Sequence, residues 1–454
     1  MMKIVNPATG RVVAEMNTEP TAALGGRLAA SRKAQILWAA RPLAERMGAI
    51  ERFRASLEAS VDTLARTLTT EMGKPIGQAR GEVRGTLGRI NFFLGCAEAV
   101  LADRVVHEEE GLREILAREP LGVVANVSAW NYPYFVGANV FVPALLAGNA
   151  VLYKPSEHAS MTGLAIANLL WEAGVPNDVF VPLVGDGEVG AELIRQPVDG
   201  VFFTGSWATG RRIAEVVGPR MIPLQLELGG KDPAYICEDV DVAAVAAGTA
   251  DGAFYNTGQS CCSVERIYVH ESIHDAFVEA FVATVRGFKL GDPLDEDTYI
   301  GPLTRDEQRG VLQAQVKDAL DRGATLHCGG QYADREGFYY EPTVLTGVNE
   351  DMVVMRDESF GPIIGIQSVS GDDAAIELMN ETDYGLTSAV YTKDGARARR
   401  ILAQLDSGSA YWNCCDRVSP KLPWSGRRRS GMGLTLSEDG LRVFTRPKAY
   451  HLRG

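Results

Sequence analysis

The sequence lacks the marks of a membrane, secreted or nucleic-acid-binding protein. It has no apolar run near the roughly 18 residues of a membrane-spanning helix, and residues 1–7 carry no apolar core of a secretion signal. Lys and Arg (45) are outnumbered by Asp and Glu (58), which leaves a net charge of −13. Because nucleic acids and anionic membranes bind basic surfaces, we expect neither as a partner.

Cysteine is also scarce, with seven residues in 454. Their count is odd and their spacing is not that of a disulfide scaffold, which is typical of a protein from the reducing cytoplasm. Two adjacent pairs occur, at 261–262 and 414–415. Zinc sites instead place a few residues between their cysteines and often add histidine, and neither pair follows that pattern. We therefore expect no metal.

The composition is that of a globular protein, 46% hydrophobic and 23% charged, and the length suits two or three domains. Short apolar runs alternate with helical stretches in both halves of the chain. In order, the runs lie at 121–127, 150–153, 201–204, 234–236, 266–269, 364–369, 389–392 and 409–412. Because strands that alternate with helices predict parallel sheets covered by helices, we expect an α/β fold of two doubly wound domains. Their joint is expected near residues 227–231.

Two segments fit neither domain, namely residues 101–118 and the C-terminal tail. As extended strands they would form an arm, and exposed strand edges invite pairing with another chain. We therefore expect a homo-oligomer. A solvated acidic loop fits the composition of the first segment nearly as well.

Cys261 is the candidate nucleophile. It stands beside Gly258 and Gln259, between a helical run at 240–253 and a strand at 266–269. Only a thiolate attacks a carbonyl, and backbone N–H groups or a helix N-terminus lower the pKa of a thiol. Taken alone, Cys261 and its neighbour Cys262 are more often two small buried residues.

Two stretches suit a dinucleotide. Lys154 and Glu157 follow the run at 150–153, where they would grip ribose hydroxyls, and an acid there repels a 2′-phosphate and favours NAD. The alternative is a surface ion pair. Residues 203–210 form a strand-to-helix junction whose glycines let a phosphate approach the backbone, although they are not a Gly-x-Gly-x-x-Gly motif.

Three polar residues suit the chemistry itself. Glu227 lies among apolar residues, and if buried it would have a raised pKa and serve as a general base. Asn131 ends the first strong strand, where its amide would donate to a developing oxyanion. Glu358 stands beside an aromatic residue and a turn. Taken singly, each also fits an exposed strand residue, a plain turn or a solvated loop.

Together and in this order, the motifs closely resemble the NAD(P)-dependent aldehyde dehydrogenase superfamily. The resemblance covers nearly the whole chain, from the turn at 6–10 to the Trp-Ser-Gly at 424–426. Its most specific motifs are Trp-Asn-Tyr-Pro at 130–133, Phe-Thr-Gly-Ser at 203–206, Glu-Leu-Gly-Gly-Lys at 227–231, Gly-Gln-Ser-Cys at 258–261 and Glu-Ser-Phe-Gly-Pro at 358–362.

The resemblance implies covalent oxidation of an aldehyde to a carboxylic acid. In this family the Cys two places after Gln is the nucleophile, here Cys261. The Asn of the Trp-Asn-x-Pro motif, here Asn131, forms the oxyanion hole with the backbone N–H of the nucleophile. The Glu of Glu-Leu-Gly-Gly, here Glu227, is the base that hydrolyses the thioester left after hydride transfer to NAD+.

The implied cofactor is NAD, with NADP as the alternative. Lys154 and Glu157 match contacts to the adenosine ribose, Ser206 matches a pyrophosphate contact, and Glu358 and Phe360 match the nicotinamide ribose and ring. The implied cofactor-binding residues are Trp130, Lys154, Glu157, Thr204, Gly205, Ser206, Gly229, Glu358 and Phe360.

The resemblance also implies a domain plan. A Rossmann-like NAD-binding domain would occupy 1–100 and 120–228, a catalytic domain 229–440, and a small β oligomerisation arm 101–119 and 441–454. A homodimer or homotetramer would follow. Near the C-terminus the family often has Pro-Phe-Gly-Gly and then Gly-Arg-Glu, whereas this chain has Pro-Trp-Ser-Gly at 423–426 and Gly-Leu-Thr at 433–435. These departures bear on the substrate mouth and the oligomer contacts.

By motif alignment the substrate tunnel is mostly aromatic and apolar. Its expected lining is Tyr132, Val136, Asn139, Tyr255, Val418 and Trp424. Semialdehyde dehydrogenases often carry a cation for the substrate carboxylate on the helix after Trp-Asn-x-Pro, but residues 134–139 hold no Lys or Arg. Arg417 is an alternative source, although Arg is more often exposed. We therefore expect a neutral aliphatic or aromatic aldehyde, with broad tolerance for chain length.

Other functions stay open at this point. A semialdehyde dehydrogenase and an enzyme that passes the acyl group to coenzyme A are alternatives within the family, and the presence of Glu227 favours hydrolysis over the latter. An esterase that uses Cys261 and a non-catalytic binding protein on the same fold are alternatives from other classes. The cofactor motifs argue against the first, and the intact Cys261, Glu227 and Asn131 against the second.

Overall fold

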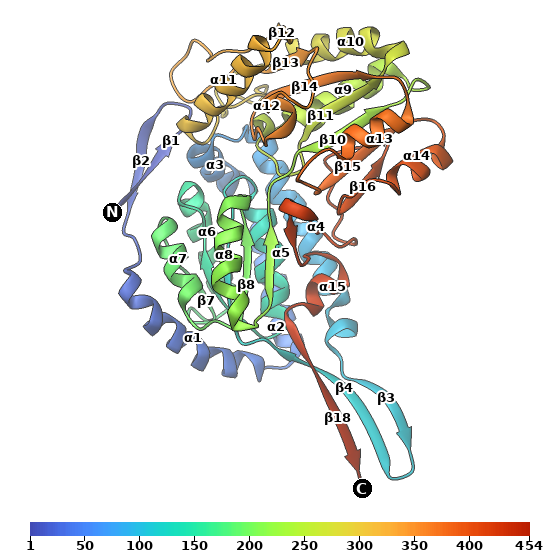
Figure 1. Ribbon diagram of the computed structural model, residues 1–454. Helices are drawn as coiled ribbons and strands as arrows, with labels where there is room; N and C mark the ends of the chain where they lie inside the picture. The colour runs from blue at the N-terminus through green and yellow to red at the C-terminus, as the bar shows by residue number, and fades with distance from the viewer.

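The computed structural model describes all residues, 1–454, and contains two α/β lobes and a projecting arm (Figure 1). A short hairpin of β1 (Met2–Asn6) and β2 (Arg11–Met16) opens the chain beside the second lobe. No helix combines the length and the apolarity that crossing a membrane requires. The expected α/β fold, with two doubly wound sheets and a small β arm, is confirmed.

The first lobe is built on a six-stranded sheet in the order β17-β9-β8-β5-β6-β7. All its neighbouring strands are parallel except β17, which pairs antiparallel with β9. The bounds are β5 (Val123–Val127), β6 (Ala150–Lys154), β7 (Phe180–Pro182), β8 (Gly200–Thr204), β9 (Leu224–Glu227) and β17 (Gly431–Met432). Strands β5, β6 and β8 are almost wholly buried, as their continuous apolar runs require of a sheet covered on both faces.

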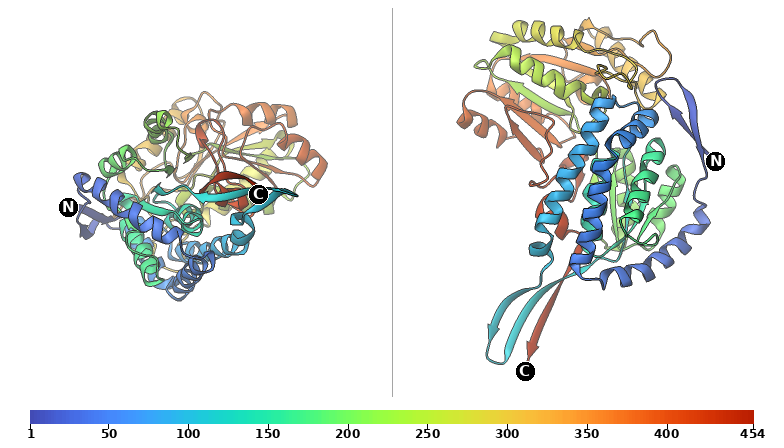
Figure 2. Two further views of the ribbon diagram at one scale, coloured as in Figure 1. Left: turned by 90° about the horizontal axis from the view of Figure 1, so that it is seen from below. Right: turned by 180° about the vertical axis from the view of Figure 1, so that it is seen from behind.

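Helices cover both faces of this sheet, as right-handed crossovers demand (Figure 1). Their bounds are α1 (Leu24–Ala39), α2 (Leu43–Ala59), α3 (Val61–Met72), α4 (Ile76–Leu101), α5 (Pro133–Leu146), α6 (Ser160–Glu172), α7 (Gly187–Arg195) and α8 (Trp207–Val217). Helix α3 ends at Gly73, whose φ of 85° is the left-handed conformation that glycine adopts freely at a helix C-terminus. The long helix α4 then runs along the back of the molecule and packs on α5 (Figure 2).

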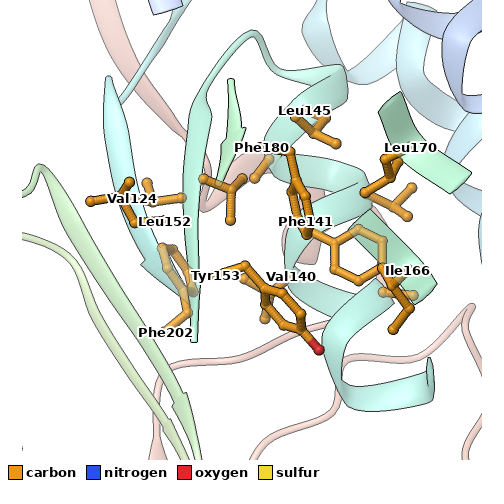
Figure 3. Close-up of a cluster of buried hydrophobic side chains, with 14 of the residues drawn as sticks. Val124, Val140, Phe141, Leu145, Leu152, Tyr153, Ile166, Leu170, Phe180 and Phe202 are labelled. Atoms are coloured by element: carbon orange, nitrogen blue, oxygen red, sulfur yellow. The ribbon is translucent and has the colours of Figure 1, made fainter. Parts of the chain in front are cut away.

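Aromatic side chains hold α5 against the first sheet. Phe141 of α5 meets Tyr153 of β6 and Phe180 of β7 with ring centroids 6.0 and 5.4 Å apart, and Figure 3 shows these rings between Leu152 and Ile166. Each such pair is worth about 0.5–1.5 kcal/mol beyond the apolar area it buries. The packing fixes the start of α5, where Asn131 and Tyr132 lie.

The second lobe is built on a seven-stranded sheet in the order β12-β13-β14-β11-β10-β15-β16, in which only the pair β12–β13 is antiparallel. Its strands are β10 (Asp232–Ile236), β11 (Val264–His270), β12 (Thr325–Cys328), β13 (Thr343–Thr346), β14 (Ile363–Val369), β15 (Thr387–Tyr391) and β16 (Ser409–Trp412). Its helices are α9 (Val242–Phe254), α10 (His274–Arg286), α11 (Asp306–Asp321), α12 (Val353–Arg356), α13 (Asp372–Asn380) and α14 (Gly395–Leu402). Two separate apolar clusters, one with α9 and α10 and one with α11 to α14, cover its two faces.

The arm is a three-stranded antiparallel sheet that extends away from both lobes (Figures 1 and 2). It contains β3 (Arg104–Glu109), β4 (Leu112–Pro120) and the C-terminal β18 (Thr445–Arg453), and β3 and β18 are its free edges. The short helix α15 (Ser437–Arg442) precedes β18 and packs with α4 and α5. Strand β17 and helix α15 pack with the first lobe, whereas the expected domain plan assigns residues up to 440 to the catalytic domain. The residue limits of that plan stay a prediction.

Candidate active site

A cleft of about 860 Å³ lies between the two lobes. Every residue predicted to be catalytic or to bind the cofactor lines it, although these residues come from motifs spread over more than 200 positions. They are Trp130, Asn131, Lys154, Glu157, Thr204, Gly205, Ser206, Glu227, Gly229, Cys261, Glu358 and Phe360. Their roles stay predictions.

Cys261 follows a strained turn. After α9, Asn256 and Thr257 have φ of 54° and 58°, a left-handed conformation that non-glycine residues rarely adopt, and Gly258 continues it at 70°. A Cβ at Gly258 would collide with a backbone carbonyl, so no other residue fits there. Buried hydrogen bonds hold the turn, since the Asn256 N–H donates to Gln78 Oε1 at 2.8 Å. The turn leaves Cys261 half-buried on the wall of the cleft.

The adjacent Cys262 faces the other way. It is buried, and its thiol donates to Asp416 Oδ1 at 3.0 Å. The contact with Cys261, burial and the Asp416 carboxylate all raise the pKa of the Cys262 thiol well above its ordinary value. Because only a thiolate is a strong nucleophile, Cys262 stays a protonated donor, and Cys261 is the thiol that the cleft presents.

Asn131 is tied to the turn that carries Cys261. Its Nδ2 donates to the Gln259 carbonyl at 3.1 Å, and Asn256 Nδ2 donates to the same carbonyl at 3.0 Å. Its own carbonyl accepts from Lys74 Nζ at 2.7 Å. An amide nitrogen carries two N–H groups, so one stays available for an oxyanion beside Cys261.

Glu227 is the last residue of β9 and is buried, with 6% of its surface exposed. Neither carboxylate oxygen has a hydrogen-bond partner in the protein. Burial, and then the charge of the Cys261 thiolate, raise the pKa of Glu227 well above its ordinary value. A buried carboxyl with unused oxygens at the edge of a cleft can take a proton from a water molecule there.

The adenosine end of the predicted site lies beyond β6 and β8. Lys154 is buried and its Nζ lies 3.2 Å from Glu157 Oε2. Burial by itself would raise the pKa of Glu157, but the Lys154 ammonium, a backbone hydrogen bond and His158 together outweigh it and lower that pKa. Ser206 caps α8 by accepting from the Thr209 N–H at 3.4 Å, and both residues line the cleft, so the N-terminus of α8, which favours negative charge, lies at the cleft wall.

The opposite end is built by a network that the sequence analysis missed. Glu265 pairs with the buried Lys231 at 2.7 Å and accepts from the Phe360 N–H at 3.0 Å. Glu358 accepts from the Gly230 N–H at 3.1 Å, and burial followed by the charge of Glu265 raises its pKa to about 8. A Cβ at Gly229 would collide with the Glu358 carboxylate, which explains the glycine. No motif marks Glu265, although a charged residue inside the apolar strand β11 is an unusual feature.

The six predicted substrate residues do not line this cleft. Tyr132, Val136 and Asn139 belong to the start of α5, Tyr255 to the turn before Cys261, and Val418 and Trp424 to the C-terminal loop. The charges of Asp416 and Tyr255 add to burial in raising the pKa of Tyr132, so these groups lie near one another. Val418 and Trp424 share an apolar cluster with Cys261. Their role as a tunnel stays a prediction.

Helix α4 brings buried charges to this side of Cys261 that the sequence analysis did not foresee. Lys74, just before α4, pairs with Glu82, and Arg89 Nη1 donates to Asn139 Oδ1 at 2.7 Å. The available signal was their position, because Glu82 and Arg89 fall seven residues apart on the buried stripe of α4, where apolar residues are expected. Arg417, the alternative cation of the sequence analysis, is exposed.

Known proteins resemble this chain over nearly its whole length. The profile of the "Aldehyde dehydrogenase family" matches residues 1–450. A betaine aldehyde dehydrogenase of Mesorhizobium japonicum is 34% identical, over 99% of this chain and 93% of that protein. An NADP(+) succinate-semialdehyde dehydrogenase of Deinococcus radiodurans is 35% identical, over 98% of this chain and 93% of that protein.

A solved structure resembles the whole chain. PnpE, a protein of Pseudomonas sp. WBC-3 crystallised in complex with nicotinamide adenine dinucleotide, superposes with a TM-score of 0.96 at 32% identity. The likeness covers 100% of this chain and 94% of that one. The profile match and the relatives establish that this chain belongs to the aldehyde dehydrogenase family.

Proposed function

We propose that the protein oxidises an aldehyde to its carboxylic acid with NAD+, through a thioester on Cys261 that Glu227 helps to hydrolyse. The observation that carries the proposal is the single cleft in which Cys261, Asn131 and Glu227 meet the predicted cofactor residues. NADP is the alternative cofactor.

The residues of the cleft fit a dinucleotide. Lys154 and Glu157 offer a donor and an acceptor for ribose hydroxyls, and the open N-terminus of α8 suits a pyrophosphate. The Glu358 carboxylate, which accepts only one N–H from the protein, has capacity for the hydroxyls of a second ribose. A nicotinamide held by these residues would supply the acceptor for the hydride of the aldehyde carbon. The Glu157 carboxylate repels a 2′-phosphate, which favours NAD.

The first half-reaction belongs to Cys261 and Asn131. The Cys261 sulfur forms a bond to the aldehyde carbon, and the carbonyl oxygen becomes an oxyanion. The free N–H of Asn131 Nδ2 and the backbone N–H of Cys261 stabilise this oxyanion, and one such donor is worth about 2.7–4 kcal/mol. Loss of hydride from the same carbon, as the oxyanion reforms a carbonyl, leaves a thioester on Cys261.

Glu227 acts in the second half-reaction. The thiolate charge of Cys261 is one reason that the pKa of Glu227 is raised, and thioester formation removes this charge. Acylation therefore lowers the pKa of Glu227, so that more of it is ionised and able to accept a proton at the moment when a water molecule must be deprotonated. Attack of that water breaks the carbon–sulfur bond and releases the acid. The presence of Glu227 favours hydrolysis over transfer to coenzyme A.

For the substrate, the expectation from the sequence is a neutral aldehyde. It rests on the predicted lining, in which Val136, Val418 and Trp424 are apolar. The alternative is a semialdehyde, and Arg89 beside Asn139 is the observation that favours it.

We further propose that the arm pairs with a second copy of the chain. Its outer strands β3 and β18 are almost wholly exposed and leave unpaired backbone groups at both edges. A homodimer or homotetramer would cover them. The seven free cysteines are compatible with a reducing cytoplasm.

The proposed function is tested by following NADH absorbance with a panel of aldehydes, with and without coenzyme A. We expect NADH to form with an aldehyde and NAD+, at a rate that coenzyme A leaves unchanged, with the free acid as product. An acyl-coenzyme A product would contradict the hydrolytic role of Glu227. Ester cleavage by Cys261 without any aldehyde oxidation would overturn the proposal.

A further inference from the structure

Arg89 is a buried cation that forms no ion pair, although the charge of Glu82, seven residues earlier on α4, acts on it. Only 6% of its surface is exposed, and no Asp or Glu lies within ion-pair distance of its guanidinium. Its one hydrogen bond to the protein is the 2.7 Å contact from Nη1 to Asn139 Oδ1. Since buried charges in proteins are normally paired, the missing partner calls for an explanation.

The guanidinium is held in a defined position. Its central carbon lies 3.9 Å from the centroid of the Phe135 ring, a cation–π contact, and Phe135 stacks on Tyr132 with centroids 5.8 Å apart. These rings follow Asn131 directly in the chain, so the position of Arg89 is linked to that of the oxyanion donor. Gly85, one turn earlier on α4, has no room for a Cβ beside Phe135, which lets the helix approach this closely.

The unused N–H groups of Arg89 keep some access to solvent. Nε and Nη2 have no partner in the protein, yet they are not among the polar atoms sealed from solvent. After Glu82, the charges of Cys262 and Cys261 also act on Arg89, which places it near the nucleophile, and it does not line the cofactor cleft. A planar guanidinium with two free donors matches the two oxygens of a carboxylate.

The other charges near Cys261 do not offer this combination. Lys74 is occupied by Glu82 and the Asn131 carbonyl. Asp416 accepts from Cys262, and burial raises its pKa to about 7, so it is a weak anchor for a cation at neutral pH. Arg89 stays charged there, since burial lowers its pKa only to about 10.

We propose that Arg89 binds the carboxylate at the far end of the substrate, so that the preferred substrates are aldehydes with a terminal acid group. This inference rests on the proposed oxidation of an aldehyde, and it selects the semialdehyde alternative over the neutral aldehydes expected from the sequence. Asn139 and Phe135 hold the guanidinium, and the cation comes from α4 instead of the first turns of α5. Neutral and cationic aldehydes would leave the Arg89 charge unpaired.

The test compares aldehydes of matched length on wild type, Arg89→Met and Arg417→Met. The panel is 4-oxobutanoate and 5-oxopentanoate, the neutral butanal and pentanal, and the cationic trimethylammonioacetaldehyde. We expect Arg89→Met to lower kcat/KM for the acids about 10- to 150-fold, mainly through KM, because a charged hydrogen-bonded contact is lost. Neutral aldehydes should change less than about threefold, and the exposed Arg417 should behave as wild type.

Two further measurements keep the result interpretable. Arg89→Lys should recover part of the loss, and the dicarboxylates succinate and glutarate should inhibit wild type competitively but not Arg89→Met. A wild-type preference for neutral or cationic aldehydes would overturn the proposal, as would a loss that follows Arg417. Equal loss for acids and neutral aldehydes would also overturn it. Failure of the proposed function itself would look different, as an absence of NADH with every aldehyde.

Discussion

The two sides of Cys261 are built in different ways. On the cofactor side, the predicted ligands lie at the ends of β5, β6, β8 and β9. Backbone groups, the N-terminus of α8 and glycines form much of this predicted binding surface. On the other side, side chains from α4, α5, the turn before Cys261 and the C-terminal loop meet. The first side is defined by short stretches of chain, and the second by contacts between distant ones.

The difference suggests a division of roles. A cofactor with one fixed shape can be held by backbone geometry, which tolerates few changes. Two relatives, each about a third identical to this chain, are named for different substrates, betaine aldehyde and succinate semialdehyde. Single side chains such as Arg89, which reach the site from a helix outside the motifs, are the means by which such a preference can change without disturbing the cofactor.

The largest expected effect on turnover is at Cys261, where the cofactor side and the substrate side meet. Cys261→Ala should lower turnover by about 10⁴-fold or more, because no other thiol is presented to the cleft. NAD+ binding, measured by fluorescence titration, should be unchanged. As a matched control, Cys262→Ala should keep turnover within about tenfold, since its thiol is a protonated donor to Asp416. Activity that survives in Cys261→Ala and disappears in Cys262→Ala would exchange the two roles.

Glu227→Gln should produce the next largest effect, and only after the hydride step. A rapid burst of NADH should be followed by steady turnover about 10²- to 10⁴-fold slower, because the thioester accumulates when the base is lost. Stopped-flow absorbance and mass spectrometry of the acyl-enzyme would check this. Steady turnover at the wild-type rate would exclude Glu227 as the base.

The pH dependence gives an independent check on Glu227. Its raised pKa means that the carboxyl is protonated at low pH and becomes a base as the pH increases. Turnover limited by hydrolysis should therefore increase with pH in wild type. The same profile should be flat in Glu227→Gln over this limb, whereas a parallel increase would assign the titration to another group.

The features that could be predicted from the sequence are those on the cofactor side, which short motifs define. The strand–helix alternation predicted both sheets, and every residue that the motifs predict to bind the cofactor lines the cleft. Arg89 was missed because its partner Asn139 is 50 residues away and no local pattern links them. The Lys231–Glu265 pair escaped for the same reason, as did β17, a two-residue strand that pairs next to Glu227. Contacts of this kind depend on tertiary packing, which periodicity does not encode.

On the substrate side of Cys261, we expect Lys74 to act on stability, in contrast to Arg89, which we propose binds the substrate. Lys74→Met would leave Glu82 buried and unpaired, and we expect a loss of about 3–5 kcal/mol in the free energy of unfolding. Replacing both residues, as Lys74→Met with Glu82→Leu, should recover most of it, since a buried pair adds little over an apolar pair. Denaturant unfolding would measure both. If Lys74→Met kept full stability, the pair would not be the support beneath Asn131 that the structure indicates.

The smallest expected effect tests the cofactor side at its exposed end. Glu157→Gln should raise kcat/KM with NADP by about tenfold, because a neutral amide no longer repels the 2′-phosphate. The value with NAD should fall only a few-fold, since the amide oxygen still accepts from a ribose hydroxyl. The matched control is Glu188→Gln, an exposed acid at the start of α7 outside the cleft, which should change neither. Equal changes with both cofactors would show that Glu157 does not discriminate between them, and would leave the choice to the backbone that surrounds it.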